Sequence, residues 1–314
     1  MIRIKIIFIW ALAILVTSCT HKELCYDHTH TRNIIVQFDW SKSPEATPRS
    51  MSLYLFPESG DKPLRYEFAN KDGGQIRVVA GNYKAICMNS DVRDITIQDR
   101  DDFDLFCIST KDILSISGLS INKVSAESLP KSKSKTDERW VYSPEQIWSG
   151  CHDNVQISEH GQVINITPEG HIKNCQVQIN NAENLEWITG MSATISSLSG
   201  GHHPAFKRES EELVTIPFEV RYDTNTRTVN GSFTFFGHCP TVKTTHQLII
   251  YSILADDSKW YYTYDVTEQI EKAEDPYNIY ITLDELPLPK PVMSGGGFHP
   301  VIGEWNEIEI NISM

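Results

Sequence analysis

The chain has 314 residues, of which 40% are hydrophobic, and a formal net charge of −13 at pH 7. A protein this acidic offers no electrostatic basis for binding a phosphate backbone, so the composition argues against nucleic-acid partners. The length exceeds that of one ordinary domain and the hydrophobic content suffices for packed cores, so we expect two domains.

The first eighteen residues have the layout of a secretory signal peptide. Arg3 and Lys5 supply positive charge, 6–16 is an unbroken apolar run, and small residues precede Cys19. The run is too short for a transmembrane helix, which needs about 20 residues. The small residues and Cys19 resemble the lipobox of bacterial lipoproteins, in which the thiol is acylated. We expect a signal peptide over 1–18 and a membrane anchor on Cys19; the alternative is an ordinary signal peptide with a chance cysteine.

The next segment, 19–32, is expected to be a lipidated tether. It contains Cys25, Asp27, His28 and His30. Alternate side chains of an extended segment share a face, so the two histidines could converge on a metal. No second cluster completes a four-ligand set in the sequence, so we expect a tether beside the first domain and no metal site.

Short apolar–polar alternations predict strands through the first half of the chain. Such a pattern is typical of strands with one face on a core and one in water. From 123 to 139 it lapses into Ser, Lys, Asp and Glu, which indicates a solvated loop. We assign 33–150 to an N-terminal β-sandwich. Its clearest strands are predicted at 33–40, 51–56, 75–79 and 82–87.

Hairpin patterns dominate the second half. We expect 212–222 and 227–236 to flank one turn, and 246–254 and 260–266 to flank another. Thr267 is expected to cap a short helix over 268–273, after which 278–283 returns to strand. Many short strands with almost no helix predict an all-β fold of two β-sandwiches in tandem, the second over 151–290.

Six cysteines follow Cys19, and an even count in an exported protein permits disulfides. Cys87, Cys107 and Cys175 lie within apolar alternation, where a free cysteine behaves as a small buried hydrophobe. We therefore favour mostly free, buried cysteines. The full set is Cys25, Cys87, Cys107, Cys151, Cys175 and Cys239.

No motif predicts catalysis. The sequence has no GxSxG elbow, no HExxH helix and no Walker-type loop, so we expect a protein that is not an enzyme and needs no cofactor. The Gly-Gly-His-His-Pro segment at 200–204 is interpreted as a surface turn. Tryptophans in β-sandwiches usually belong to the core, although Trp140, Trp148, Trp187, Trp260 and Trp305 could stack on sugars.

The last segment, 291–314, ends in a predicted strand behind a flexible joint. Glycines occupy 295–297, and residues 304–314 alternate between apolar and charged or polar. Such a strand can close its own sheet, or leave it and pair with the open edge of another subunit. The residues that would be donated share one face: Ile308, Ile310, Ile312 and Met314.

Several segments, taken in order, resemble one family. They are 23–28 after the lipobox, 140–150, 260–267, 279–283, and 295–300 before Trp305. Together they are similar to Bacteroidales lipoproteins of the fimbrillin-associated type. The resemblance implies two tandem transthyretin-like β-sandwiches on an outer-membrane lipid anchor at the cell surface. It also implies fimbrial subunits as partners and a role as a fimbrial anchor, cap or assembly component through strand complementation. The alternative is a surface glycan-binding lipoprotein.

Overall fold

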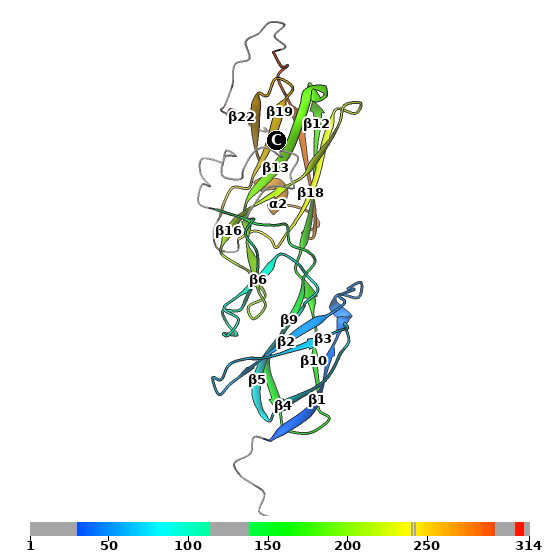
Figure 1. The fold of residues 1–314 in the computed structure, drawn as a ribbon, viewed down its shortest axis with the longest axis vertical. Coiled ribbons are helices and arrows are strands. Elements are labelled where there is room, and N and C mark those ends of the chain that lie inside the picture. The colour runs from blue at the N-terminus through cyan, green and yellow to red at the C-terminus, as the bar shows by residue number, and fades with distance from the viewer. Residues whose placement is uncertain (1–29, 114–137, 240, 242, 293–304, 311–314) are drawn as a thin grey trace, which may run out of the picture.

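The computed structural model describes residues 30–113, 138–239, 241, 243–292 and 305–310. Within these ranges the fold is all-β, as expected, with five sheets. The molecule is elongated: β1 (Thr31–Phe38) lies at one end and β22 (Trp305–Ile310) near the other (Figure 1). No helix in the described part of the chain is long and apolar enough to span a bilayer. Cys19, Ile312, Met314 and most of the expected loop at 123–139 lie outside these ranges.

Two sheets enclose the core nearest to the N-terminus. Their other strands are β2 (Met51–Pro57), β3 (Leu64–Phe68), β4 (Gly73–Val79), β5 (Gly81–Asn89), β9 (Trp148–Ile157), β10 (Val163–Ile166) and β11 (Glu169–Gly170). The orders are β10-β1-β4 and β11-β9-β5-β2-β3. Alternate side chains point inward and are fully buried, such as Ile34 and Val36 on β1 and Leu53 and Leu55 on β2.

A second pair of sheets encloses the larger core. Four strands form the order β17-β18-β12-β21: β12 (Lys173–Ala182), β17 (Val220–Asp223), β18 (Thr228–Phe235) and β21 (Asn278–Leu286). The facing sheet has the order β22-β20-β19-β13-β16-β8. Its strands besides β22 are β8 (Arg139–Trp140), β13 (Ile188–Ser199), β16 (Leu213–Phe218), β19 (Gln247–Leu254) and β20 (Lys259–Asp265). The buried rings of Tyr262 and Tyr264 donate their hydroxyls to the carbonyls of Pro287 and Glu285, at 3.0 and 2.9 Å.

A small sheet joins distant parts of the chain between these two layered pairs. It comprises β6 (Ile95–Gln98), β7 (Cys107–Thr110), β14 (Gly201–His203) and β15 (Arg208–Glu209), in the order β15-β14-β7-β6. Tyr54 and Phe56 on the outer face of β2 pack with Phe106, which directly precedes β7, and with Ile108, which lies in β7. The sheet β11-β9-β5-β2-β3 is therefore covered on both faces around β2 and β5, which explains why β2 is buried on both sides.

The helical turns in the described ranges are short: η1 (Trp40–Lys42), η3 (Leu185–Trp187) and α2 (Thr267–Glu271). Because η1 begins at Trp40, the expected strand at 33–40 ends two residues early, at Phe38. The prediction that Thr267 caps the helix is wrong, because α2 begins at Thr267 and Val266 holds the cap position. The Thr267 hydroxyl is already engaged: it donates to Asp265 at 2.5 Å and accepts from the His246 N–H at 2.8 Å.

Two expectations about continuity also differ from the structure. The segment 212–222, predicted as one strand, divides at Glu219 into β16 and β17, which lie in opposite sheets. The boundary expected at residue 150 falls inside β9, which pairs with β5 from Met88↔Ser149 to Gly81↔Ile157. Because β10 also pairs with β1, the N-terminal sheets continue past residue 150. The assignment of domains remains a prediction.

The five described cysteines are free, as expected: Cys87, Cys107, Cys151, Cys175 and Cys239. All but Cys151 are buried, and Cys151 is half-buried. Burial raises the pKa of the Cys107 and Cys175 thiols to about 12, so these thiols stay protonated at pH 7.

Candidate functional site

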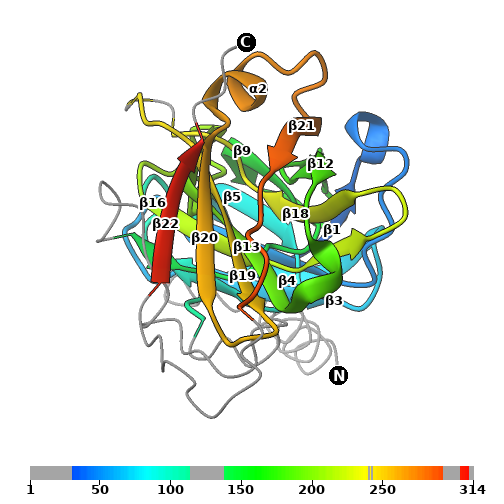
Figure 2. The same ribbon diagram turned by 90° about the horizontal axis from the view of Figure 1, so that it is seen from above.

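The tail strand β22 lies at one edge of the six-stranded sheet, parallel to β20 (Figure 2). Ile308 and Ile310 pack against the core between the two sheets, whereas Glu307 is exposed on the other face. The alternation predicted from the sequence is confirmed for these residues. In this structure β22 closes a sheet of its own chain, and its donation to another subunit stays a prediction.

The outer face of that sheet carries an aromatic cluster. The ring of Trp305, at the start of β22, packs edge-on against Tyr251, with centroids 5.5 Å apart, and against Tyr261 at 6.5 Å. Burial, together with the nearby Glu307, raises the pKa of Tyr261 to about 12. These contacts hold the first residue of β22 on one face while the isoleucines hold the other.

In the part of the chain that the structure describes, the outer side of β22 is an open edge. Among the described residues, β20 is the one strand that pairs with β22, because β22 ends the order of its sheet. The backbone N–H and C=O groups on the far side of an edge strand are available to an added strand. Recognition by such strand addition takes its affinity from main-chain hydrogen bonds and its specificity from alternate side chains.

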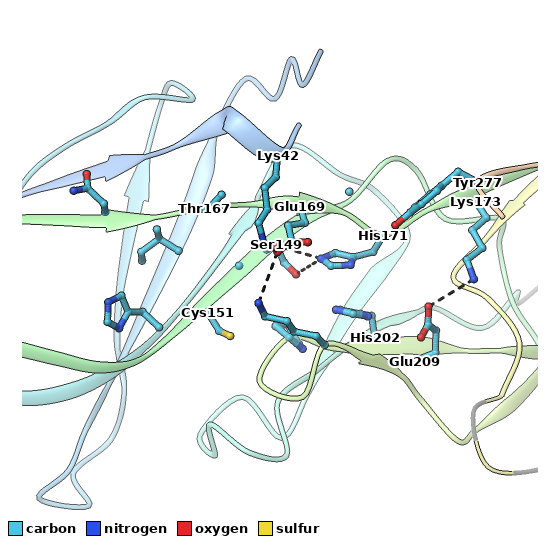
Figure 3. A pocket seen from close by; sticks show the side chains of 17 residues that line it. Lys42, Ser149, Cys151, Thr167, Glu169, His171, Lys173, His202, Glu209 and Tyr277 are labelled. Atoms are coloured by element: carbon cyan, nitrogen blue, oxygen red, sulfur yellow. Dashed lines mark hydrogen bonds and ion pairs between the residues drawn. The ribbon is translucent and has the colours of Figure 1, made fainter. Parts of the chain in front are cut away.

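A second candidate site is a cleft of about 350 Å³ where the two layered pairs and the small sheet meet (Figure 3). We call it the junction cleft. Its walls come from η1, β9, the segment from β10 to the start of β12, and the β14–β15 hairpin. The side chains that line it are mostly polar and include Ser149, Thr167, His171, His202 and Tyr277.

Two stacked histidines belong to the lining of the junction cleft. The rings of His171 and His202 lie 3.7 Å apart between centroids, at 23°. His171 Nε2 lies 2.9 Å from Ser149 Oγ. His202 is only 3% exposed, and neither of its ring nitrogens has a hydrogen-bond partner in the described part of the chain. Burial lowers the pKa of His171 to about 4 and that of His202 to about 2, so both rings are neutral at pH 7.

Charged groups surround this pair. Lys42 and Lys207 both approach Glu169, the latter at 3.7 Å, and Lys173 lies 3.9 Å from Glu209. The ion pair with Lys42 holds the pKa of the Glu169 carboxyl below its ordinary value. Three ammonium groups face two carboxylates, so the lining is locally positive on a protein with a net charge of −13.

The sequence prediction of a surface turn at 200–204 is wrong. Gly200, Gly201 and His202 are buried, and β14 lies between β7 and β15. A Cβ on Gly201 would lie 2.6 Å from the carbonyl oxygen of Ile108, so only glycine allows this approach of β14 to β7. The paired glycines were the available signal, because they indicate close packing of backbones as well as turns.

The remaining sequence candidates are not brought together. The five tryptophans named as possible sugar platforms are buried or half-buried: Trp140, Trp148, Trp187, Trp260 and Trp305. In the described ranges, no group of three or more His, Cys, Asp and Glu side chains is arranged to hold a metal ion. Cys25, Asp27 and His28 lie outside those ranges.

Comparison with known proteins gives three principal matches. The model of a domain of unknown function, DUF5119, matches residues 18–219. A candidate fimbrium anchoring subunit, Fim4B, of Bacteroides ovatus is 22% identical over 296 residues, covering 88% of this chain and 82% of Fim4B. The crystal structure of a candidate adhesin from Bacteroides ovatus superposes with a TM-score of 0.63 at 19% identity, covering 83% of this chain and 95% of that one.

A further solved structure shares the fold. The fimbrial anchor protein Mfa2 from Porphyromonas gingivalis superposes with a TM-score of 0.50 at 12% identity, over 81% of this chain and 91% of Mfa2. At these identities the structural matches show the fold alone. With the family match, they confirm the resemblance to Bacteroidales fimbrial proteins that the sequence indicated.

Proposed function

The chain belongs to the DUF5119 family, and on that premise we propose that it is a fimbrial anchor or assembly component, attached to the outer membrane by a lipid on Cys19. The similarity to a candidate fimbrium anchoring subunit and the fold shared with the anchor protein Mfa2 support this role. An acylated Cys19 would stand eleven residues before the first described residue, His30. A structural role, not catalysis, follows from the proposal.

The observation that carries the proposal is that β1 and β22 lie at opposite ends of the elongated molecule. The first described residues lead into β1 at one end of the long axis, and β22 lies near the opposite end (Figure 1). A lipid attached ahead of β1 would therefore place the open edge of β22 away from the membrane. An anchor needs this arrangement, because the fimbrial subunit must dock at the distal end.

Strand complementation is the proposed means of docking. A subunit can add an extended segment beside β22, or β22 can leave and open the edge of β20 to the incoming strand. If β22 leaves and is donated to a subunit, its apolar face consists of Ile308 and Ile310, extended by Ile312 and Met314.

We also propose that the two layered pairs of sheets are tandem transthyretin-like β-sandwich domains. The pairing of β9 and β10 with β5 and β1 favours a division near residue 171 over one at residue 150. His171 and Lys173 would then lie at the domain junction, where β11 ends and β12 begins.

A pull-down from native outer membranes, read by mass spectrometry, tests the proposal. The full chain is compared with a truncation before Gly295, which removes β22. Co-purification of pilin-like subunits with the full chain and their loss on truncation would support assembly through the tail. Binding to both forms would support an anchor that docks elsewhere. The absence of subunits from both would refute the fimbrial role.

A further inference from the structure

The junction cleft contains a buried polar group whose hydrogen bonds are missing. His202 is 3% exposed and lines the cleft, and both of its ring nitrogens are without a partner among the described residues. A neutral imidazole has one donor and one acceptor nitrogen. Leaving both unpaired inside a protein is costly, so such groups usually meet a ligand or an ordered water.

The hydrogen-bonding needs of His202 restrict the chemistry of an occupant. A carboxylate alone only accepts and an ammonium only donates, whereas a hydroxyl does both. The neighbouring groups add to the same requirement, because Ser149 offers a hydroxyl and two lysines offer ammonium donors. The ammonium groups of Lys173 and Lys207 lie 3.9 and 3.7 Å from their carboxylate partners, which are long distances for ion pairs. A ligand with several hydroxyls satisfies this mixed set.

The charge, volume and rim of the junction cleft further restrict the class of ligand. The three lysines of the cleft outnumber its two glutamates, which favours a ligand that also carries a negative charge. A volume of about 350 Å³ is at the small end of ligand pockets, which span about 300–1,000 Å³. Tyr277 lines the cleft but is 53% exposed, so its ring offers an apolar face at the rim (Figure 3).

We propose that the junction cleft is a binding site for an acidic sugar, a uronic acid unit of a glycan. Sugar hydroxyls meet His202 and Ser149, the carboxylate lies near Lys207 and Lys173, and the C–H face of the ring stacks on Tyr277. The site is separate from the β22 edge, and its occupation does not depend on the fimbrial role.

Calorimetric titration of the full chain in detergent with D-glucuronate tests the proposal, and D-glucose serves as the neutral probe. We expect saturable binding of glucuronate and weaker binding of glucose. Lys207→Ala should weaken glucuronate binding about tenfold, the effect of losing one charge-assisted hydrogen bond. The Lys207 side chain is 64% exposed, so its removal spares the fold.

Two further variants make the test decisive. Lys272→Ala removes an ammonium that is 71% exposed directly after α2, outside the cleft, and should leave the affinity unchanged. His202→Phe should abolish binding; if that variant fails to fold, Lys207→Ala and Lys272→Ala still decide the outcome. Absence of saturable binding, or equal affinity in Lys207→Ala and the unaltered chain, would overturn the proposal and leave His202 to water.

Discussion

Replacing Ile308 and Ile310 by alanine tests whether β22 is held in place by its own core. Both side chains pack against the core between the two sheets, and both are half-buried because β22 is an edge strand. An Ile→Ala change in a full core costs about 2–5 kcal/mol. Half-burial reduces this to about 1–2 kcal/mol each, and the double variant should lose about 2–4 kcal/mol of unfolding free energy.

Guanidinium denaturation of the full chain, followed by circular dichroism, measures this loss. Glu307→Ala is the control on the same strand, because Glu307 is exposed and interacts with Tyr261 and not with the core; its cost should stay below about 1 kcal/mol. A double variant as stable as the control would refute the reasoning, since it would mean that β22 does not pack on this core in solution.

Three further predictions concern the scaffold. Gly73→Ala should lower the unfolding free energy by about 2–4 kcal/mol in a denaturation experiment, because φ is +99° and a Cβ would lie 2.2 Å from the Val36 carbonyl oxygen. Gly60→Ala is its control: φ is +82° but the space is open, so the loss should be only about 1 kcal/mol. Glu138→Ala should lose about 2–4 kcal/mol, because this buried carboxylate accepts bonds from the Ser197 N–H and hydroxyl and from Thr215; an equal melting temperature would contradict this. Burial lowers the pKa of His202 from 6.5 to about 2, so the unfolded chain binds more protons between these values and stability falls as the pH drops below about 6.5, by up to about 1.4 kcal/mol per pH unit. Burial also lowers the pKa of His171, to about 4, so His202→Phe should reduce that slope to the part that His171 contributes; an unchanged slope would exclude His202 as a source.

Strands with a clear alternation were the predictable part of the fold. β4 ends at Val79 and β21 begins at Asn278, as expected, because one side of each strand meets a core and the alternation records that contact. Sheet membership was not predictable in the same way. Nothing in 212–222 marks the change of sheet at Glu219, because both parts alternate and the change depends on which distant strand each meets.

The two candidate sites also differ in whether a local sequence pattern encodes them. The face of Ile308 and Ile310 follows from a local period of two, so the sequence located it. The junction cleft joins His171 and His202, which are far apart in sequence. His202 is placed there by the pairing of β14 with β7, and His171 lies between β11 and β12. No local pattern encodes that meeting, and the glycines before His202 gave the single indication that its backbone is closely packed.

The measurement that tests the anchor role most directly is the fraction of fimbriae retained on cells of the native bacterium. Cells that express the unaltered chain are compared with cells that express Cys19→Ala, with fimbriae quantified in the cell pellet and in the medium. If the lipid on Cys19 anchors the fimbria, the variant cells should release most of their fimbriae into the medium. Equal retention by both strains, with the variant protein present in equal amount, would contradict the account.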